Sequence, residues 1–357
     1  MEKSLTKVHQ AFQEALEKKV FSAAQLWVGQ GEKNLLQLNI GKLSHGDQSS
    51  LVDKNTLFDI ASLTKVFFTT SVAMQLVEEG QLILEAPINN FFEKLDFDPN
   101  IKVHHLLSHR SGLPDWRPLY ESYPKDYPKE DLNSSRLQDY AKKISRLSLG
   151  QLPGEKRVYS DLGFILLAII LEKVTGTSLK NLWQQRVAKP LALTRSFFGP
   201  VDLKKFSVAA TENCPWRKKL IQGQVHDENT FALGGISTHA GLFSTAGDLE
   251  IWVHELWRVL AGKSLWLKKA SLKRFLEEPK LGWDSVSAVA SQSGSYFSKL
   301  SFGHLAFTGC SVWMDPRDQK YVLLLTNRVH LSRAHPQAIK KFRPKIHDLA
   351  LEALALV

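Results

Sequence analysis

The sequence is poor in the residues that build disulfide frameworks or metal clusters. It has only two cysteines, Cys214 and Cys310, which stand far apart and lack the close spacing of metal ligands. Its 12 histidines include no His-Glu-x-x-His pattern of the kind that binds catalytic zinc. These absences speak against a disulfide scaffold and against a zinc enzyme, and they favour a reduced setting for the chain.

Long apolar runs are also missing. The longest one, from Leu162 to Leu171, is too short to span a bilayer. The segment from Met1 to Lys19 has the pattern of an amphipathic helix and lacks the apolar core and small-residue cleavage site of a signal peptide. We therefore expect no membrane span and a cytoplasmic localisation, or a periplasmic one if a leader has been removed.

Two common catalytic motifs are absent. Gly262-Lys263-Ser264 matches the end of a phosphate-binding loop, but position 257 is Trp where that loop requires glycine. No Gly-x-Ser-x-Gly sequence occurs, which speaks against an α/β-hydrolase. The chemistry must therefore be sought in other residues.

The chain is basic without having the pattern of a nucleic-acid-binding protein. Its 46 Lys and Arg exceed its 36 Asp and Glu, which gives a formal charge of +10. Such a charge favours anionic partners or substrates. The basic residues are scattered, however, and no recognition motif accompanies them. We expect a small-molecule or peptide substrate and no nucleic acid, and the sequence leaves the oligomeric state open.

Strand patterns lie at both ends of the 357-residue chain, and helical patterns lie between them. A hairpin is predicted near the N-terminus, three consecutive antiparallel strands are predicted near residues 302–326, and a closing helix is expected to be interrupted near Pro344. This order predicts an α+β fold whose antiparallel sheet is formed from both termini and flanked by helices, with a mostly helical insertion. The expected lobes are 1–60 with 240–357 and 61–239, with the active site between them.

The first candidate site is Ser62 followed three residues later by Lys65. On a helix, this spacing places both side chains on one face. A serine hydroxyl needs a neighbouring base to become a nucleophile, and a lysine whose pKa is lowered by burial can be that base. The ordinary alternative is an N-cap serine and a solvated lysine.

Two further candidates follow along the chain. Tyr159 precedes Ser160 and Asp161 at the start of a strongly apolar helix, where its hydroxyl can exchange a proton with Lys65 or with a leaving group. His304 lies on a predicted strand with small neighbours, and such a strand edge can supply an N–H group to an oxyanion hole. In isolation, each would more commonly be a structural residue.

In this order, Ser-x-x-Lys, Tyr-Ser-Asp and a histidine strand resemble the class C β-lactamase and penicillin-binding-protein-like serine hydrolase family. The resemblance extends over roughly residues 20 to 330. It includes the stretch from Val103 to Pro114, which is similar to the family's His-Leu-Leu-x-His-x-Ser-Gly-Leu-Pro motif, and the stretch from Gly241 to Leu249. It implies a β-lactamase/transpeptidase-like fold.

The resemblance also implies roles for individual residues. Ser62 would be the acylated nucleophile and Lys65 its proton partner, while Tyr159 would be the general base or acid. Asp161 stands where many members have Asn, and His304 stands in the place of the third motif's lysine or histidine. The N–H groups of Ser62 and Phe307 would form the oxyanion hole, and no metal or organic cofactor is implied.

The third motif departs from the family pattern. It is usually Lys or His, then Thr or Ser, then Gly, whereas this chain has His304-Leu305-Ala306. The missing hydroxyl removes a donor that often holds a substrate carboxylate, which makes efficient β-lactamase activity doubtful.

A further stretch resembles penicillin-binding-protein-4B-like and muropeptide-amidase-like members. We hypothesise that its polar residues line the pocket and recognise a polar or amino-sugar substrate. The alternative, a charged loop held by its own hydrogen bonds, has equal weight. The residues are His226, Asp227, Glu228 and His239.

Together these observations predict a serine hydrolase that forms an acyl-enzyme on Ser62. The expected substrates are amide bonds of peptidoglycan-derived muropeptides or of peptides with D-residues. One alternative is an esterase for small esters, and another, from a different class, is a catalytically silent binder of wall fragments.

Overall fold

Strands from the two ends of the chain form one six-stranded antiparallel sheet in the order β2-β1-β11-β10-β9-β8. The computed structural model describes residues 2–46, 48–126 and 133–356. The central strands β1 and β11 pair with Leu26 opposite Leu324. This arrangement confirms the predicted sheet. The strands are β1 Ala23–Gln30, β2 Lys33–Gly41, β8 Asp284–Ser285, β9 Phe302–Leu305, β10 Ser311–Asp315 and β11 Lys320–Thr326.

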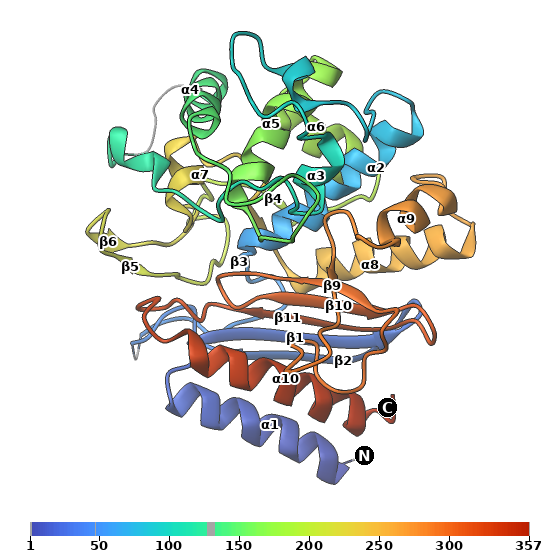
Figure 1. Ribbon diagram of the computed structural model, residues 1–357. Helices are drawn as coiled ribbons and strands as arrows, with labels where there is room; N and C mark the ends of the chain where they lie inside the picture. Colours follow the sequence, from blue (N-terminus) through green and yellow to red (C-terminus); the bar gives the residue numbers. More distant parts are fainter. Residues whose placement is uncertain (1, 47, 127–132, 357) are drawn as a thin grey trace.

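Two helices from the chain ends cover one face of the sheet (Figure 1). They are α1, Glu2–Glu17, and α10, Pro336–Ala353. Three phenylalanines, Phe12, Phe21 and Phe342, meet edge to face between these helices and the sheet, with ring centroids 5.1 to 6.1 Å apart. This packing stabilises the contact between the two ends of the chain.

The predicted interruption of the last helix is wrong. Pro344 lies inside α10, which continues through it. A proline has no N–H to donate to the carbonyl four residues earlier, here that of Lys340. Gln292 Nε2 donates to that carbonyl at 3.1 Å, which replaces the lost hydrogen bond.

The opposite face of the sheet carries most of the helices (Figure 1). Two small sheets lie in this part as well, in the orders β3-β7-β4 and β5-β6. The helices are η1 Ala61–Leu63, η2 Lys65–Thr70, α2 Ser71–Glu78, η3 Ile88–Phe91, α3 Val103–Leu107, η4 Leu119–Ser122, α4 Asn133–Ser145, α5 Asp161–Thr175, α6 Leu179–Trp183, η5 Gln184–Ala188, α7 Glu228–Ala232, α8 Ala246–Ala261 and α9 Lys269–Leu276. The short strands are β3 Phe58–Asp59, β4 Phe197–Phe198, β5 Asn213–Cys214, β6 Lys219–Leu220 and β7 Leu242–Ser244.

Helix α5 runs through the centre of this helical region. Its residues 162–171 are all buried, in agreement with the apolar run in the sequence. The hydroxyl of Ser160 accepts the N–H of Gly163 and caps its start, and Gly176, at φ +63°, ends it in the left-handed conformation. The N-terminus of α5 is thereby fixed directly after Tyr159.

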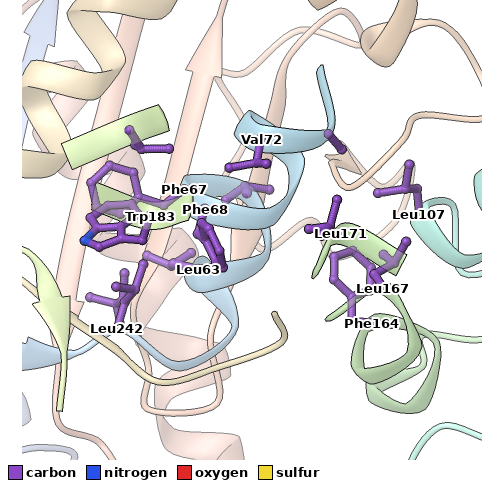
Figure 2. Close-up of a cluster of buried hydrophobic side chains, with 14 of the residues drawn as sticks. Leu63, Phe67, Phe68, Val72, Leu107, Phe164, Leu167, Leu171, Trp183 and Leu242 are labelled. Carbon is purple, nitrogen blue, oxygen red and sulfur yellow. The ribbon is translucent and has the colours of Figure 1, made fainter. Parts of the chain in front are cut away.

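The segment after Ser62 packs into the same core (Figure 2). Leu63 and Phe68 are fully buried, and the Phe67 ring lies 5.0 Å from that of Trp183. The core cluster also includes the sheet residues Trp27 and Leu323. The core is therefore continuous between the sheet and the helical region, and the division into lobes at residues 60 and 240 stays a prediction.

The sequence pattern from Ile101 to Gly112 is that of one helix, but α3 ends at Leu107, because His109 and Gly112 adopt φ +57° and +79°. The stretch from Pro114 to Ser135 is rich in Pro, Tyr and Asp, which predicts a loop long enough to be a lid or pocket wall, and its residues 127–132 lie outside the described residues. In the described part of the chain, no single helix is long and apolar enough to cross a membrane. The two helical segments 161–175 and 179–188, which are bent relative to each other, would together be long and apolar enough.

Candidate active site

Ser62 lies in a short 3-10 turn whose backbone is held from both sides. The N–H of Ile60 donates to the carbonyl of Leu242 at 3.1 Å, and the N–H of Ala61 donates to Asp59 Oδ1 at 2.9 Å. Ala61 adopts φ +41°, which is an uncommon conformation for a residue with a side chain. Such strain persists only where surrounding contacts fix it, and here it directly precedes the candidate nucleophile.

Lys65, three residues after Ser62, is completely buried. Its Nζ lies 3.0 Å from Ser62 Oγ, 2.7 Å from Asp161 Oδ1 and 3.1 Å from the carbonyl oxygen of His239. An ammonium has three N–H donors, so these three acceptors satisfy it. The predicted pairing of Ser62 with Lys65 is therefore present in the structure.

The expectation of a lowered Lys65 pKa is wrong. Burial alone would lower it, but the Asp161 carboxylate and the Tyr159 hydroxyl raise it above its ordinary value. Lys65 is therefore an ammonium at neutral pH in this arrangement. No local pattern indicates this effect, because Asp161 follows Lys65 by almost a hundred residues.

Tyr159 completes the group. Its phenol is close enough to Ser62 and Lys65 for both side chains to lower its pKa, and the Lys65 ammonium lies 4.9 Å from the centre of its ring. Burial raises the pKa of the phenol, and the neighbouring Lys65 charge opposes this rise only in part. Tyr159 is thus a neutral phenol at neutral pH, within reach of the serine proton.

The imidazole of His109 packs against the ring of Tyr159, a contact that the sequence did not indicate. Its ring lies 4.4 Å from that of Tyr159, and its Nδ1 accepts the N–H of Ser160 at 3.0 Å. Burial holds its pKa well below the ordinary value, so the ring is neutral with its proton on Nε2. The positive φ of His109 turns the chain so that the imidazole reaches Tyr159.

His304 lies on β9 beside Tyr159, with 5.8 Å between the two rings. Its Nδ1 donates to the carbonyl of Leu305 at 2.7 Å. Burial lowers the pKa of the ring to about 4, so it is neutral at pH 7. Among the described residues, its Nε2 has no hydrogen-bond partner. His304 therefore presents an unpaired acceptor near Tyr159.

Phe307 lies in the tight turn that follows β9. Thr308 Oγ1 donates to the carbonyl of Asp59 at 2.8 Å, which ties this turn to the segment before Ser62. The Phe307 side chain is 48% exposed, and the Arg328 guanidinium lies 4.3 Å from the centre of its ring. The turn is thus close to the serine segment, and the oxyanion role of the Phe307 N–H stays a prediction.

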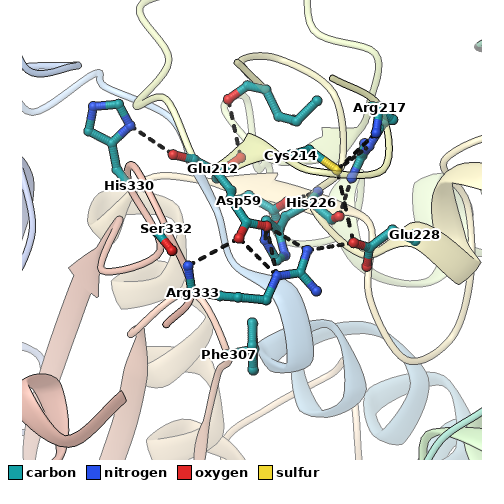
Figure 3. A network of polar contacts seen from close by, with 12 residues as sticks. Asp59, Glu212, Cys214, Arg217, His226, Glu228, Phe307, His330, Ser332 and Arg333 are labelled. Atoms are coloured by element: carbon teal, nitrogen blue, oxygen red, sulfur yellow. Dashed lines mark hydrogen bonds and ion pairs between the residues drawn. The ribbon is translucent and has the colours of Figure 1, made fainter. Parts of the chain in front are cut away.

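The four residues of the loop expected to line the pocket are held by hydrogen bonds within the protein. His226 Nε2 lies 2.9 Å from Glu212, and its N–H donates to Asp59 Oδ2 at 2.6 Å (Figure 3). Glu228 and Glu212 both receive hydrogen bonds from Arg333. This network connects the loop to the strand β3 that leads into Ser62.

Asp227 and His239 form the second half of this loop. Asp227 Oδ1 accepts the N–H of Thr230 at 2.7 Å, which caps α7, and lies 2.9 Å from His239 Nε2. The His239 side chain is buried, and its backbone carbonyl accepts a hydrogen bond from Lys65. The loop is thus held by its own hydrogen bonds and contacts the site through its backbone, and the pocket-lining role of the four residues stays a prediction.

Glu212, Cys214 and Glu228 bring ligand atoms within 4.8 Å of one another, close enough to hold a metal ion. The Arg333 guanidinium, however, already bridges the two carboxylates. A cation in this position is therefore supplied by the protein itself, and we assign no metal to it.

Comparison with known proteins agrees with this geometry. The Beta-lactamase family model matches residues 8–341. A putative D-alanyl-D-alanine carboxypeptidase of Escherichia coli (strain K12) is 31% identical over 79% of this chain and 71% of its own length. An N-acetylmuramyl-L-alanine amidase of Bacillus subtilis (strain 168) is 30% identical over 79% of this chain and 70% of its own length. The solved structure of EstCE1, described as a hydrolase with promiscuous acyltransferase activity, has a TM-score of 0.72 at 19% identity and covers 96% of this chain and 99% of that one.

Proposed function

We propose that this chain, a serine hydrolase that belongs to the Beta-lactamase family, cleaves amide bonds of peptidoglycan-derived muropeptides or of D-residue peptides through an acyl-enzyme on Ser62. The observation that carries the proposal is that Lys65 and Tyr159 both lie at Ser62. Lys65 Nζ donates to Ser62 Oγ at 3.0 Å, and the Tyr159 phenol is close enough to Ser62 and Lys65 for both to lower its pKa. This is the arrangement that a serine needs to transfer its proton and attack a carbonyl carbon.

In the proposed reaction, Tyr159 in its phenolate form takes the proton of Ser62 while the Lys65 ammonium stabilises the phenolate. The serine oxygen bonds to the carbonyl carbon, and the N–H groups of Ser62 and Phe307 stabilise the resulting oxyanion. Tyr159 then gives its proton to the leaving amine. Tyr159 then takes a proton from a water molecule, whose oxygen attacks the acyl carbon, and Tyr159 returns that proton to Ser62 Oγ as the acyl–serine bond breaks.

The other polar groups have supporting roles in this proposal. Asp161 holds Lys65 in place and keeps it charged. Neutral His304 offers its unpaired Nε2 as an acceptor beside Tyr159. Leu305 provides no hydroxyl to bind a carboxylate next to the bond that is cleaved. We therefore favour the amide of a muropeptide over β-lactams as the substrate, in line with the name of the Bacillus subtilis relative.

A substrate panel analysed by mass spectrometry tests the proposal. Wild type and Ser62→Ala would be incubated with N-acetylmuramyl-L-alanyl-D-isoglutamine, with a peptide ending in D-Ala-D-Ala, and with a 4-nitrophenyl ester. Cleavage of either amide by the wild type alone would support the proposal and would identify the bond. Cleavage of the ester alone would favour the small-ester esterase. Failure to cleave any of the three would favour a silent binder of wall fragments.

A further inference from the structure

A pocket of about 410 Å³ lies at the edge of the sheet where β8 pairs with β9. Its wall combines residues of the helical region, such as Arg110 and Arg157, with residues of the sheet and its loops, such as Lys280, Trp283 and Leu305. None of these residues belongs to the group that meets at Ser62. The pocket is thus a separate feature that the proposed reaction leaves unused.

The charges in this pocket are unevenly compensated. Arg157 forms an ion pair with Asp284 at 2.5 Å, and Lys280 lies 3.4 Å from Glu278. Among the described residues, the Arg110 guanidinium donates hydrogen bonds only to backbone carbonyls, those of Gly154 and Glu155 at 3.2 and 3.5 Å. No ion pair joins Arg110 to a carboxylate of the described residues. The pocket therefore contains a guanidinium that lacks a counter-ion.

Unpaired donors occur in the same wall. The Nε atom of Arg110 and the indole nitrogens of Trp283 and Trp313 are buried and have no hydrogen-bond partner in the described part of the chain. Both tryptophans line the pocket and are only 2% exposed. All three atoms can only donate, and a buried donor without an acceptor costs stability. The two tryptophans pack in different core clusters, so of these donors we consider only the Arg110 guanidinium as a partner for a ligand with acceptor oxygens and a negative charge.

The pocket adjoins the candidate active site. Leu305, which lines it, follows His304 in β9, but the two side chains point to opposite faces of the sheet, and Leu305 packs with the cluster under α1 and α10. Arg157, also in its wall, precedes Tyr159 by two residues, and Arg157 and Asp284 both act electrostatically on His304, as Lys65 does. Because these two wall residues act on His304, which lies beside Tyr159, we take a substrate that reacts at Ser62 to extend towards this pocket.

We propose that the pocket binds a carboxylate of the substrate that lies away from the bond being cleaved, with Arg110 as its main partner. This inference rests on the proposed hydrolysis at Ser62 and specifies the substrate further. It also locates a carboxylate-binding group in a chain whose third motif has Leu305 where a hydroxyl is usual. A bidentate guanidinium–carboxylate pair would provide both the binding energy and the orientation.

Matched ester pairs test this proposal. The substrates are 4-nitrophenyl monoesters of succinic, glutaric and adipic acid, and the same compounds with the free carboxylate capped as a methyl ester. The quantity to measure is the ratio of kcat/KM for the free acid to kcat/KM for the capped ester. For the best chain length, we expect Arg110→Gln to lower this ratio at least about tenfold. We expect Arg110→Lys to lower this ratio less, because lysine keeps the positive charge and loses only the planar guanidinium that can form two parallel hydrogen bonds.

The control variant is Arg146→Gln, which removes one positive charge from an exposed position outside the pocket. It should keep the wild-type ratio. Because the ratio compares two substrates on one preparation, partial misfolding of a variant cancels. A ratio that is the same in wild type, Arg110→Gln and Arg146→Gln would overturn the proposal.

Calorimetric titration with glutarate separates this proposal from the proposed function, since binding needs no turnover. Binding to wild type and Ser62→Ala that is lost in Arg110→Gln would support the pocket even if no ester were cleaved. Absence of glutarate binding, together with no preference for the free acids, would overturn the pocket while leaving hydrolysis at Ser62 intact.

Discussion

The carboxylate of Asp161 lies 2.7 Å from the ammonium of Lys65. Against the effect of burial it raises the pKa of Lys65, and together with burial it raises the pKa of Tyr159. In the resting arrangement, both groups therefore carry their protons. The proposed attack by Ser62 requires one of these protons to leave, so the reactive form becomes more abundant as the pH rises.

This relationship predicts the pH dependence of the reaction. For the wild type, log kcat/KM on an activated ester should rise with pH and reach no plateau below about pH 9, because the phenol pKa lies above its ordinary value of about 10. Asp161→Asn removes the negative charge that raises both pKa values. Its rising limb should therefore move to lower pH, by about one to three units.

The control for this experiment is Asp139→Asn, which removes a carboxylate that pairs with Lys143 on α4, away from Ser62. Its profile should coincide with that of the wild type. Identical profiles for Asp161→Asn and the wild type would contradict the assigned role of Asp161, whatever their absolute rates.

His109 provides a second prediction. It positions Tyr159, and among the described residues its side chain forms no hydrogen bond with Ser62. His109→Gly keeps the positive φ but loses the acceptor for the Ser160 N–H and the ring behind Tyr159. We expect kcat to fall roughly 10- to 100-fold with little change in KM, because a displaced catalytic group costs rate more than binding.

His109→Asn is the matched variant, since asparagine tolerates a positive φ and carries a side-chain oxygen that can accept the Ser160 N–H. It should retain more of kcat than His109→Gly. Steady-state kinetics on one activated ester would check both variants, and wild-type kcat in His109→Gly would show that Tyr159 needs no such support.

Glu212 provides a third prediction, which concerns stability. Burial alone would raise its pKa, but hydrogen bonds from His226 and Arg333 lower it from 4.5 to about 2. A carboxyl group with a lowered pKa stabilises the fold above its unfolded-state pKa, and this contribution disappears as the pH falls through the folded-state value. Glu212→Gln should lower the free energy of unfolding at pH 7 by about 2 to 3 kcal/mol.

The difference between wild type and Glu212→Gln should then shrink from pH 4.5 downwards and vanish near pH 2, as measured by urea unfolding. Glu93→Gln is the control, because Glu93 pairs with Lys173 at the surface with 87% of its side chain exposed. Such surface pairs contribute little. A constant difference across this pH range would show that Glu212 acts through packing instead of charge.

The sequence was sufficient to predict the sheet and the central site because both depend on local patterns. The alternating strands and the apolar run of α5 determine the layers, and the spacing of Ser62 and Lys65 needs only one turn to bring the two side chains together. The fold class follows from the order of these elements along the chain. The family is likewise readable from short motifs.

Long-range contacts account for what the sequence did not reveal. The raised pKa of Lys65 depends on Asp161. The continuity of α10 at Pro344 depends on Gln292, a residue of another segment whose side chain replaces the hydrogen bond that proline cannot form. The self-bonded state of the His226 loop depends on Arg333, which lies more than a hundred residues later. No local pattern records these partners.

The most direct test of the account is the intact mass of the protein after incubation with a fluorophosphonate. The reagent phosphonylates an activated serine, so the account predicts one adduct in the wild type and none in Ser62→Ala. Tyr159→Phe should react much more slowly, since it lacks the phenolate oxygen that accepts the serine proton. An adduct that persists in Ser62→Ala, or no adduct in the wild type, would contradict the assignment of Ser62 as the nucleophile.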